Sequence, residues 1–229
     1  MWQSFIRRFS AHYRIVLFDF PGQGKGRVLS GSSSVSLDEE VEILHEVAKI
    51  TKVKDTFLCS ASWGGVVALA FATKYPHLIK RLVLRSLGTK PNKRMVETIK
   101  SGTKIDSDNR EQIAKTLINS FGENLPSPVK RRIASQFMAM TPERLSAFYE
   151  HGLLVIAARN LRDVVNFKEI HTETVLLAGE NDTIIDLDDV KYLATQLPNC
   201  SIKIIKNIGH FMHLESDDVL EIYNEVLSQ

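Results

Sequence analysis

At residues 56–65 the sequence reads Thr56-Phe57-Leu58-Cys59-Ser60-Ala61-Ser62-Trp63-Gly64-Gly65. It opens with a short apolar run, and residues 64–75 are almost entirely apolar, which is typical of a buried strand followed by a buried helix. Ser62 lies at the junction. A tight strand-to-helix turn lifts a serine hydroxyl above the sheet edge, and the crowded turn requires small residues two positions before and after it. Ser60 and Gly64 are small, although glycine is usual at the position of Ser60. The stretch predicts a nucleophilic serine at position 62.

A serine hydroxyl needs a base to become a nucleophile. An apolar strand predicted at 202–206 is followed by Asn207-Ile208-Gly209-His210. A histidine just past the last strand of a βα series lies over the same sheet edge as Ser62, so His210 is the predicted base. His213, three residues further on, is the competing candidate and ranks below it.

The base in turn needs a carboxylate to orient its ring. The strand predicted at 174–178 runs into Gly179-Glu180-Asn181-Asp182, and Asp182 is the preferred partner of His210. Glu180 and Asp186 are its rivals, but Asp186 is expected to cap the helix that follows. The chain order Ser, Asp, His is the order found in α/β-hydrolases.

Strands and helices alternate on both sides of the stretch around Ser62. Apolar runs predict strands at 14–20, 56–59, 81–84, 174–178 and 202–206, and helical spacing predicts helices after Ser36 and at 64–75, 187–196 and 217–227. Such alternation predicts an α/β fold with a mostly parallel sheet and helices on both faces. Between 91 and 167 only helices are expected, at 110–121, 128–140 and 142–158. We therefore predict a core of residues 1–90 and 168–229 and a helical lid of residues 91–167, inserted before the last two strands.

The composition narrows the possible functions. The chain has 229 residues, of which 44% are apolar and 24% charged, with a net charge of +2. The absence of a long apolar run argues against a membrane span, and the near-neutral charge argues against nucleic-acid binding. Because no secretory signal begins the sequence, a cytoplasmic location is expected. Residues 90–168 hold 14 Lys and Arg but only 8 Asp and Glu, which suits an anionic partner.

These residues resemble the α/β-hydrolase superfamily. Within it the sequence is most similar to the 3-(3-hydroxyalkanoyloxy)alkanoate synthases, which make rhamnolipid precursors, and to hydroxyacyl-carrier transacylases. The matching stretches run colinearly over nearly the whole chain, and the motif Ser60-Ala61-Ser62-Trp63-Gly64-Gly65 is the most specific of them. The others are residues 16–19, 38–44, 197–201, 209–211 and 214–216.

The resemblance implies an enzyme of lipid metabolism in which Ser62, Asp182 and His210 are catalytic and no metal or redox cofactor is used. The implied substrate is a 3-hydroxyacyl thioester of a carrier protein or of coenzyme A. The backbone N–H of Trp63 supplies one donor to the oxyanion. Apolar lid residues are candidates for the acyl site, although each is also explained as lid core: Phe137, Met138, Met140, Phe148 and Leu154.

One departure from the family matters. Family members begin with further strands and a loop that supplies a second oxyanion donor, and here a helix is expected already at about residues 2–12. The sequence is therefore expected to be truncated at its N-terminus, with Met1 an internal methionine. A central strand between those predicted at 14–20 and 56–59 is then missing.

Three functions remain open at this point. The first is acyl transfer from the serine to the 3-hydroxyl of a second hydroxyacyl group, and the second is hydrolysis of small acyl esters or thioesters with the same three residues. The third is a binding-only or inactive protein, because part of the oxyanion hole is absent. The oligomeric state is not indicated by the sequence.

Overall fold

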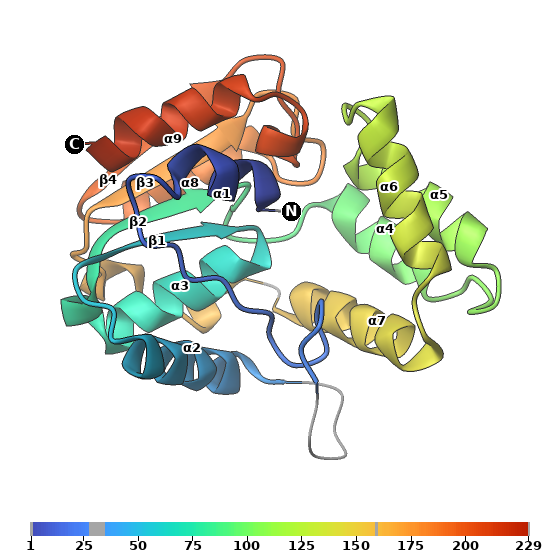
Figure 1. Ribbon diagram of the computed structural model, residues 1–229, viewed down its shortest axis with the longest axis horizontal. Helices are drawn as coiled ribbons and strands as arrows, with labels where there is room; N and C mark the ends of the chain where they lie inside the picture. Colours follow the sequence, from blue (N-terminus) through green and yellow to red (C-terminus); the bar gives the residue numbers. More distant parts are fainter. Residues whose placement is uncertain (1, 28–34, 159, 229) are drawn as a thin grey trace.

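The computed structural model describes residues 2–27, 35–158 and 160–228. Its core is a sheet of four strands in the order β1-β2-β3-β4, and all three strand pairs are parallel (Figure 1). The strands are β1 Thr56–Ala61, β2 Ile79–Arg85, β3 Thr174–Gly179 and β4 Cys200–Ile205. Since parallel strands point the same way, their carboxyl ends meet at one edge of the sheet, where the residues that follow each strand gather.

Helices cover both faces of this sheet, as predicted from the alternation of elements. On one face lie α2 (Leu37–Thr51), α3 (Trp63–Lys74) and α8 (Leu187–Gln196), and on the other lie α1 (Gln3–Phe9) and α9 (Asp218–Ser228) (Figure 1). The side chains of β2 divide accordingly. Leu82 and Leu84 pack with the first group and Val83 with the second, because successive side chains of a strand point to opposite faces.

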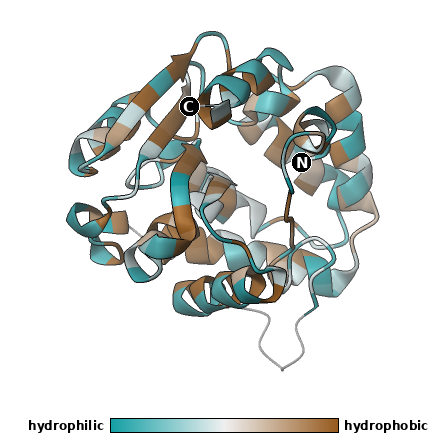
Figure 2. Ribbon diagram, turned by 60° about the vertical axis from the view of Figure 1, so that its left-hand side comes forward, coloured by the Kyte–Doolittle hydropathy of each residue, from teal (hydrophilic) through white to brown (hydrophobic). Residues whose placement is uncertain are grey.

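Local sequence explains most helix positions. Helix α2 begins with the capping box read from the sequence: Ser36 Oγ accepts the N–H of Glu39, and the Glu39 carboxylate accepts the N–H of Ser36. Helix α3 is apolar on nearly every side and is buried between the sheet and α2. Figure 2 shows the same division, with hydrophobic colouring along the strands and on the sheet-facing sides of the helices.

Between β2 and β3 the chain forms helices that pack beside the sheet rather than on its faces (Figure 1). They are α4 Lys93–Gly102, α5 Arg110–Phe121, α6 Ser127–Met138 and α7 Pro142–Ala157. Three of them lie where the sequence predicted helices, and α4 is additional. Helices α5, α6 and α7 have a small apolar core of their own, built around Ile113, Phe137 and Leu145.

The strand expected at 14–20 was wrong. This segment is neither helix nor strand, and two of its apolar residues are substantially exposed, Leu17 at 48% and Phe18 at 36%. A strand exists only where a neighbour accepts its backbone hydrogen bonds. Within the described ranges β1 pairs only with β2, so the other edge of β1 is unpaired and residues 14–20 form no ladder with it.

No helix in the described residues is long and apolar enough to cross a lipid bilayer.

Candidate functional site

Ser62 occupies a strained position between β1 and α3. Its backbone has φ 50° and ψ −126°, a conformation that costs a non-glycine residue roughly 1–3 kcal/mol and is concentrated at functional sites. Ser60 and Gly64 flank the turn as the sequence predicted, and a Cβ added at Gly64 would meet Ser60 Cβ at 3.7 Å, an ordinary van der Waals contact. The turn leaves Ser62 partly exposed at the carboxyl end of β1.

His210 and Asp182 form a buried pair at the same edge. His210 Nδ1 lies 2.9 Å from Asp182 Oδ2, and the two side chains are only 8% and 5% exposed. The other carboxylate oxygen of Asp182 accepts the backbone N–H groups of Ile184 and Ile185 at 2.9 and 3.1 Å. These bonds fix the carboxylate, which contacts Nδ1 of the imidazole and leaves Nε2 as the ring nitrogen that it does not contact.

One two-residue segment at the end of β2 holds both halves of the site. The N–H of Ser62 donates to the carbonyl oxygen of Arg85 at 3.0 Å. The hydroxyl of Ser86 donates to the carbonyl oxygen of His210 at 2.8 Å, and the buried Arg85 guanidinium donates to the same oxygen at 3.3 Å. Ser62 and His210 are thus anchored to adjacent residues, although no hydrogen bond joins their side chains within the described structure.

The rival residues lie elsewhere. His213 is buried in a short 3₁₀ helix, Met212–Leu214, where its ring packs against Trp2 at 5.2 Å between centroids. The Glu180 side chain accepts the N–H of Asn207. Asp186 stands at the N-cap of α8, but its side chain does not cap the helix and instead accepts a bond from Asn92.

Glu215 was not predicted as a site residue from the sequence, yet its carboxylate binds the backbone of the loop that carries His210. Oε2 accepts the N–H of Gly209 at 2.6 Å, and Oε1 accepts the N–H of Phe211 at 2.9 Å. These two peptide groups flank His210 on either side. A carboxylate spaced five residues after the histidine was the available signal in the sequence.

Glu40 is the second residue that sequence reasoning missed. It is only 2% exposed, and its Oε2 accepts the indole N–H of Trp63 at 2.6 Å. Burial raises the pKa of this carboxyl to about 7, against the opposing effect of the Trp63 hydrogen bond. The signal was a carboxylate on the apolar stripe of α2, which also carries Leu37, Val41 and Leu44.

The proposed acyl-site residues fall into three environments. Phe137, Met140 and Phe148 belong to the small apolar core shared by α5, α6 and α7. Met138 is 55% exposed on α6, whereas Leu154 on α7 packs against the main core. Leu154 therefore lies with the residues that surround α3 and the sheet, and the first three lie among the helices themselves.

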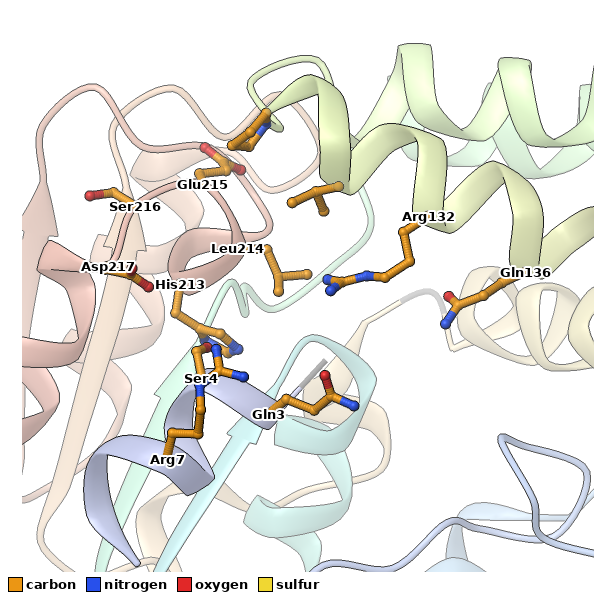
Figure 3. Close-up of a pocket in the computed structure, with 12 residues that line it drawn as sticks. Gln3, Ser4, Arg7, Arg132, Gln136, His213, Leu214, Glu215, Ser216 and Asp217 are labelled. Carbon is orange, nitrogen blue, oxygen red and sulfur yellow. The ribbon is translucent and has the colours of Figure 1, made fainter.

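A cavity of about 340 Å³ adjoins the His210 loop on the side facing α1 and α6 (Figure 3). Its walls include Arg7 from α1, Arg132 from α6, and Leu214, Glu215 and Asp217 from the segment after His210. Ser62 does not line it. The cavity carries two cationic and two acidic side chains, so it presents no net charge that would select an ion.

Among the residues whose placement is described, no group of three or more His, Cys, Asp and Glu side chains is arranged to hold a metal ion. The pair at His210 is instead suited to proton transfer, since one ring nitrogen is fixed by a carboxylate and the other is left to act as a base.

Comparison with known proteins places this geometry in a family. Residues 1–217 match the family model described as alpha/beta hydrolase fold. A pimeloyl-[acyl-carrier protein] methyl ester esterase from Nitrosospira multiformis is 26% identical over 238 residues, covering 95% of this chain and 85% of the relative. An (R)-3-hydroxydecanoyl-ACP:CoA transacylase from Pseudomonas aeruginosa is 23% identical over 212 residues, covering 92% of this chain and 70% of the relative.

Solved structures agree on the fold. An alpha/beta hydrolase enzyme from a Medee basin deep-sea metagenome library superposes with a TM-score of 0.83 at 19% identity, covering 100% of this chain and 84% of that one. A thermophilic esterase from Thermogutta terrifontis gives 0.79 at 20% identity, covering 99% and 84%. The parallel sheet, the strained serine turn and the family match together show that the chain belongs to the α/β-hydrolase fold family.

Proposed function

We propose that this protein is a serine acyltransferase that acts on 3-hydroxyacyl thioesters through Ser62, His210 and Asp182. The observation that carries the proposal is the strained turn at Ser62, anchored to the same end of β2 as the loop of His210, whose ring is held by Asp182. A strained serine turn anchored next to the loop of a carboxylate-held imidazole supports acyl transfer, which needs a serine and a base at one sheet edge.

In the proposed reaction each of these groups has one role. His210 Nε2 takes the proton of Ser62 Oγ, which attacks the thioester carbonyl carbon and forms a tetrahedral oxyanion. The N–H of Trp63 donates to that oxyanion, and the N-terminus of α3 adds its favourable dipole. The C–S bond then breaks, and the thiolate leaves with the proton from His210. Asp182 stays ionised throughout and stabilises the imidazolium.

The second half-reaction returns the serine. The 3-hydroxyl of another hydroxyacyl group gives its proton to His210 and attacks the carbonyl carbon of the acyl-enzyme. The bond from that carbon to Ser62 Oγ then breaks and His210 returns the proton to Oγ, which releases free Ser62 and a dimeric ester. The excess of basic residues between 90 and 168 favours an acidic carrier protein or the phosphates of coenzyme A as the thioester carrier. The name of the Pseudomonas relative, a transacylase of a 3-hydroxyacyl group, supports this choice of substrate.

Hydrolysis is the second candidate, with water in place of the hydroxyl acceptor. The Nitrosospira relative, named as an esterase of an acyl-carrier methyl ester, and the esterases among similar structures favour it. Both candidates use the same acyl-enzyme, so they differ only in which acceptor reaches it.

Incubation with a 3-hydroxydecanoyl thioester separates the two. A dimeric ester among the products supports transfer, and free acid alone defeats it in favour of hydrolysis. The Ser62→Ala variant is the matched control and forms neither product. If a fluorophosphonate probe fails to label Ser62 in folded protein, the binding-only alternative is favoured over both.

A further inference from the structure

We propose that Glu40 is a positioning residue for the reaction at Ser62 and that it acts through the indole ring of Trp63. The inference rests on the proposed function, in which the backbone N–H of Trp63 stabilises the oxyanion. It adds a residue from a different helix, 23 positions away in the sequence, to the groups that control the nucleophile.

The contact between Glu40 and Trp63 is short and enclosed. The two residues are 2% and 8% exposed, and 2.6 Å separates Glu40 Oε2 from Trp63 Nε1. A buried carboxylate is strongly unfavourable unless it is paired, yet Glu40 forms no salt bridge among the described residues. The indole N–H is its main compensation. An apolar residue would be the ordinary choice on this face of α2, so the carboxylate is better explained by what it does to Trp63.

Trp63 transmits this contact to the site because it directly follows Ser62 and begins α3. Its ring is held on a second side by His151 of α7, in an edge-on contact with centroids 5.8 Å apart. His151 in turn contacts Gln23, with 3.3 Å between His151 Nδ1 and Gln23 Nε2. A side chain held by two contacts has fewer rotamers open to it, and in this proposal the Glu40 bond thereby keeps the Trp63 backbone N–H directed at the oxyanion.

Burial, rather than a neighbouring charge, is the main cause of the raised pKa of Glu40. On its own helix, Asp38 and Glu42 lie near Lys74 of α3, and Glu39 is engaged with Ser36. From α7, His151 contacts the Trp63 ring edge-on, and burial lowers the pKa of His151 and favours its neutral form. Among the residues that the structure describes, no cation pairs with Glu40, so its ionisation near neutral pH alters the acceptor of the indole bond.

The first test measures the rate at which a fluorophosphonate probe labels Ser62. Glu40→Leu leaves the indole N–H without an acceptor and is expected to slow labelling about tenfold, the equivalent of about 1.4 kcal/mol in the barrier. Glu40→Gln retains an acceptor oxygen and is expected to restore most of the rate. Trp63→Phe removes the donor, and combining it with Glu40→Leu is expected to slow labelling no further. Glu46→Gln, at an exposed site on the same helix, is the control.

The second test measures the contact between Glu40 and Trp63 by tryptophan fluorescence. In a Trp2→Phe background, Trp63 is the sole tryptophan, and its fluorescence is expected to change in one step near pH 7. The step is expected to persist in His151→Gln and to vanish in Glu40→Gln. This fluorescence titration tests the proposed role of Glu40 even if the Glu40→Leu variant does not fold. A step that survives in Glu40→Gln overturns the proposal.

The two proposals fail in different ways. If the wild-type protein is not labelled at Ser62, the proposed function fails and the role of Glu40 fails with it. If the wild type is labelled but Glu40→Leu reacts at the same rate, or its effect adds fully to that of Trp63→Phe, only the role of Glu40 is refuted.

Discussion

Glu215 is expected to hold the His210 loop in its working shape. Its two carboxylate oxygens accept the N–H groups of Gly209 and Phe211 at 2.6 and 2.9 Å. A hydrogen bond to a charged group contributes about 1.5–3 kcal/mol. Both hydrogen bonds are only partly buried, so water replaces some of what is lost. We therefore expect Glu215→Ala to lower the free energy of unfolding by about 3 kcal/mol, near the lower end of the sum of two such bonds.

The same substitution is expected to slow labelling of Ser62 more than the loss of folded protein explains. Releasing two peptide groups beside His210 lets its ring move away from Asp182, so the base is less often in place. Glu215→Gln keeps one acceptor oxygen but turns an NH₂ donor toward a backbone N–H, so it is expected to recover less than half of the stability. Urea unfolding gives the free energies, and a fluorophosphonate probe gives the rates.

Glu221→Ala is the matched control, because this exposed glutamate on α9 forms its ion pair with the exposed Arg8. Such surface pairs contribute about 0–1 kcal/mol. The reasoning is refuted if Glu215→Ala unfolds at the same urea concentration as this control. It is refuted equally if labelling falls only in proportion to the fraction of unfolded protein.

Three further changes test other parts of the structure. Asp182→Asn is expected to lower the rate of ester cleavage about 10³–10⁴-fold without unfolding the protein, because the imidazole loses its fixed tautomer; a loss below tenfold with intact circular dichroism would exclude this role. Gly179→Ala places a Cβ 2.4 Å from the carbonyl oxygen of Ile208, so thermal unfolding is expected to show a loss of about 2 kcal/mol, and an unchanged midpoint would contradict the close approach of β3 to this loop. For Glu40 the folded-state pKa is raised from 4.5 to about 7. Between these pH values the folded protein therefore binds more protons than the unfolded protein does. The wild type is expected to lose about 3 kcal/mol of stability as the pH rises through that window. Glu40→Gln is expected to reduce this pH dependence of the free energy of unfolding. If the free energy of unfolding changes equally between pH 5 and pH 8 in the wild type and in Glu40→Gln, the pKa of the carboxyl is not perturbed.

The sequence predicted the elements whose causes are local. The apolar runs of β1 to β4, the capping box of α2 and the three helices at 110–121, 128–140 and 142–158 are all recognisable from spacing alone, and the structure has them within a few residues. Periodicity reports which side of an element is buried, and that is enough to arrange a βα series as a parallel sheet. It also placed Asp182 beside His210, because both follow neighbouring strands.

Residues 14–20 show where that reasoning fails. Their apolar character is typical of a strand, but a strand is defined by its hydrogen bonds to a partner. In the described structure residues 14–20 pair with no strand, although the outer edge of β1 is unpaired. Propensity alone does not supply a hydrogen-bonding neighbour.

What the sequence determined by itself is therefore the order of the elements and the three residues at the ends of β1, β3 and β4. Tertiary structure alone decided the contacts of Glu40 with Trp63 and of the buried Arg85 with His210, which join residues 23 and 125 positions apart. The physical reason is that a buried polar group takes whichever partner the packing brings within hydrogen-bond distance. That distance depends on how whole helices and strands meet, which no local pattern records.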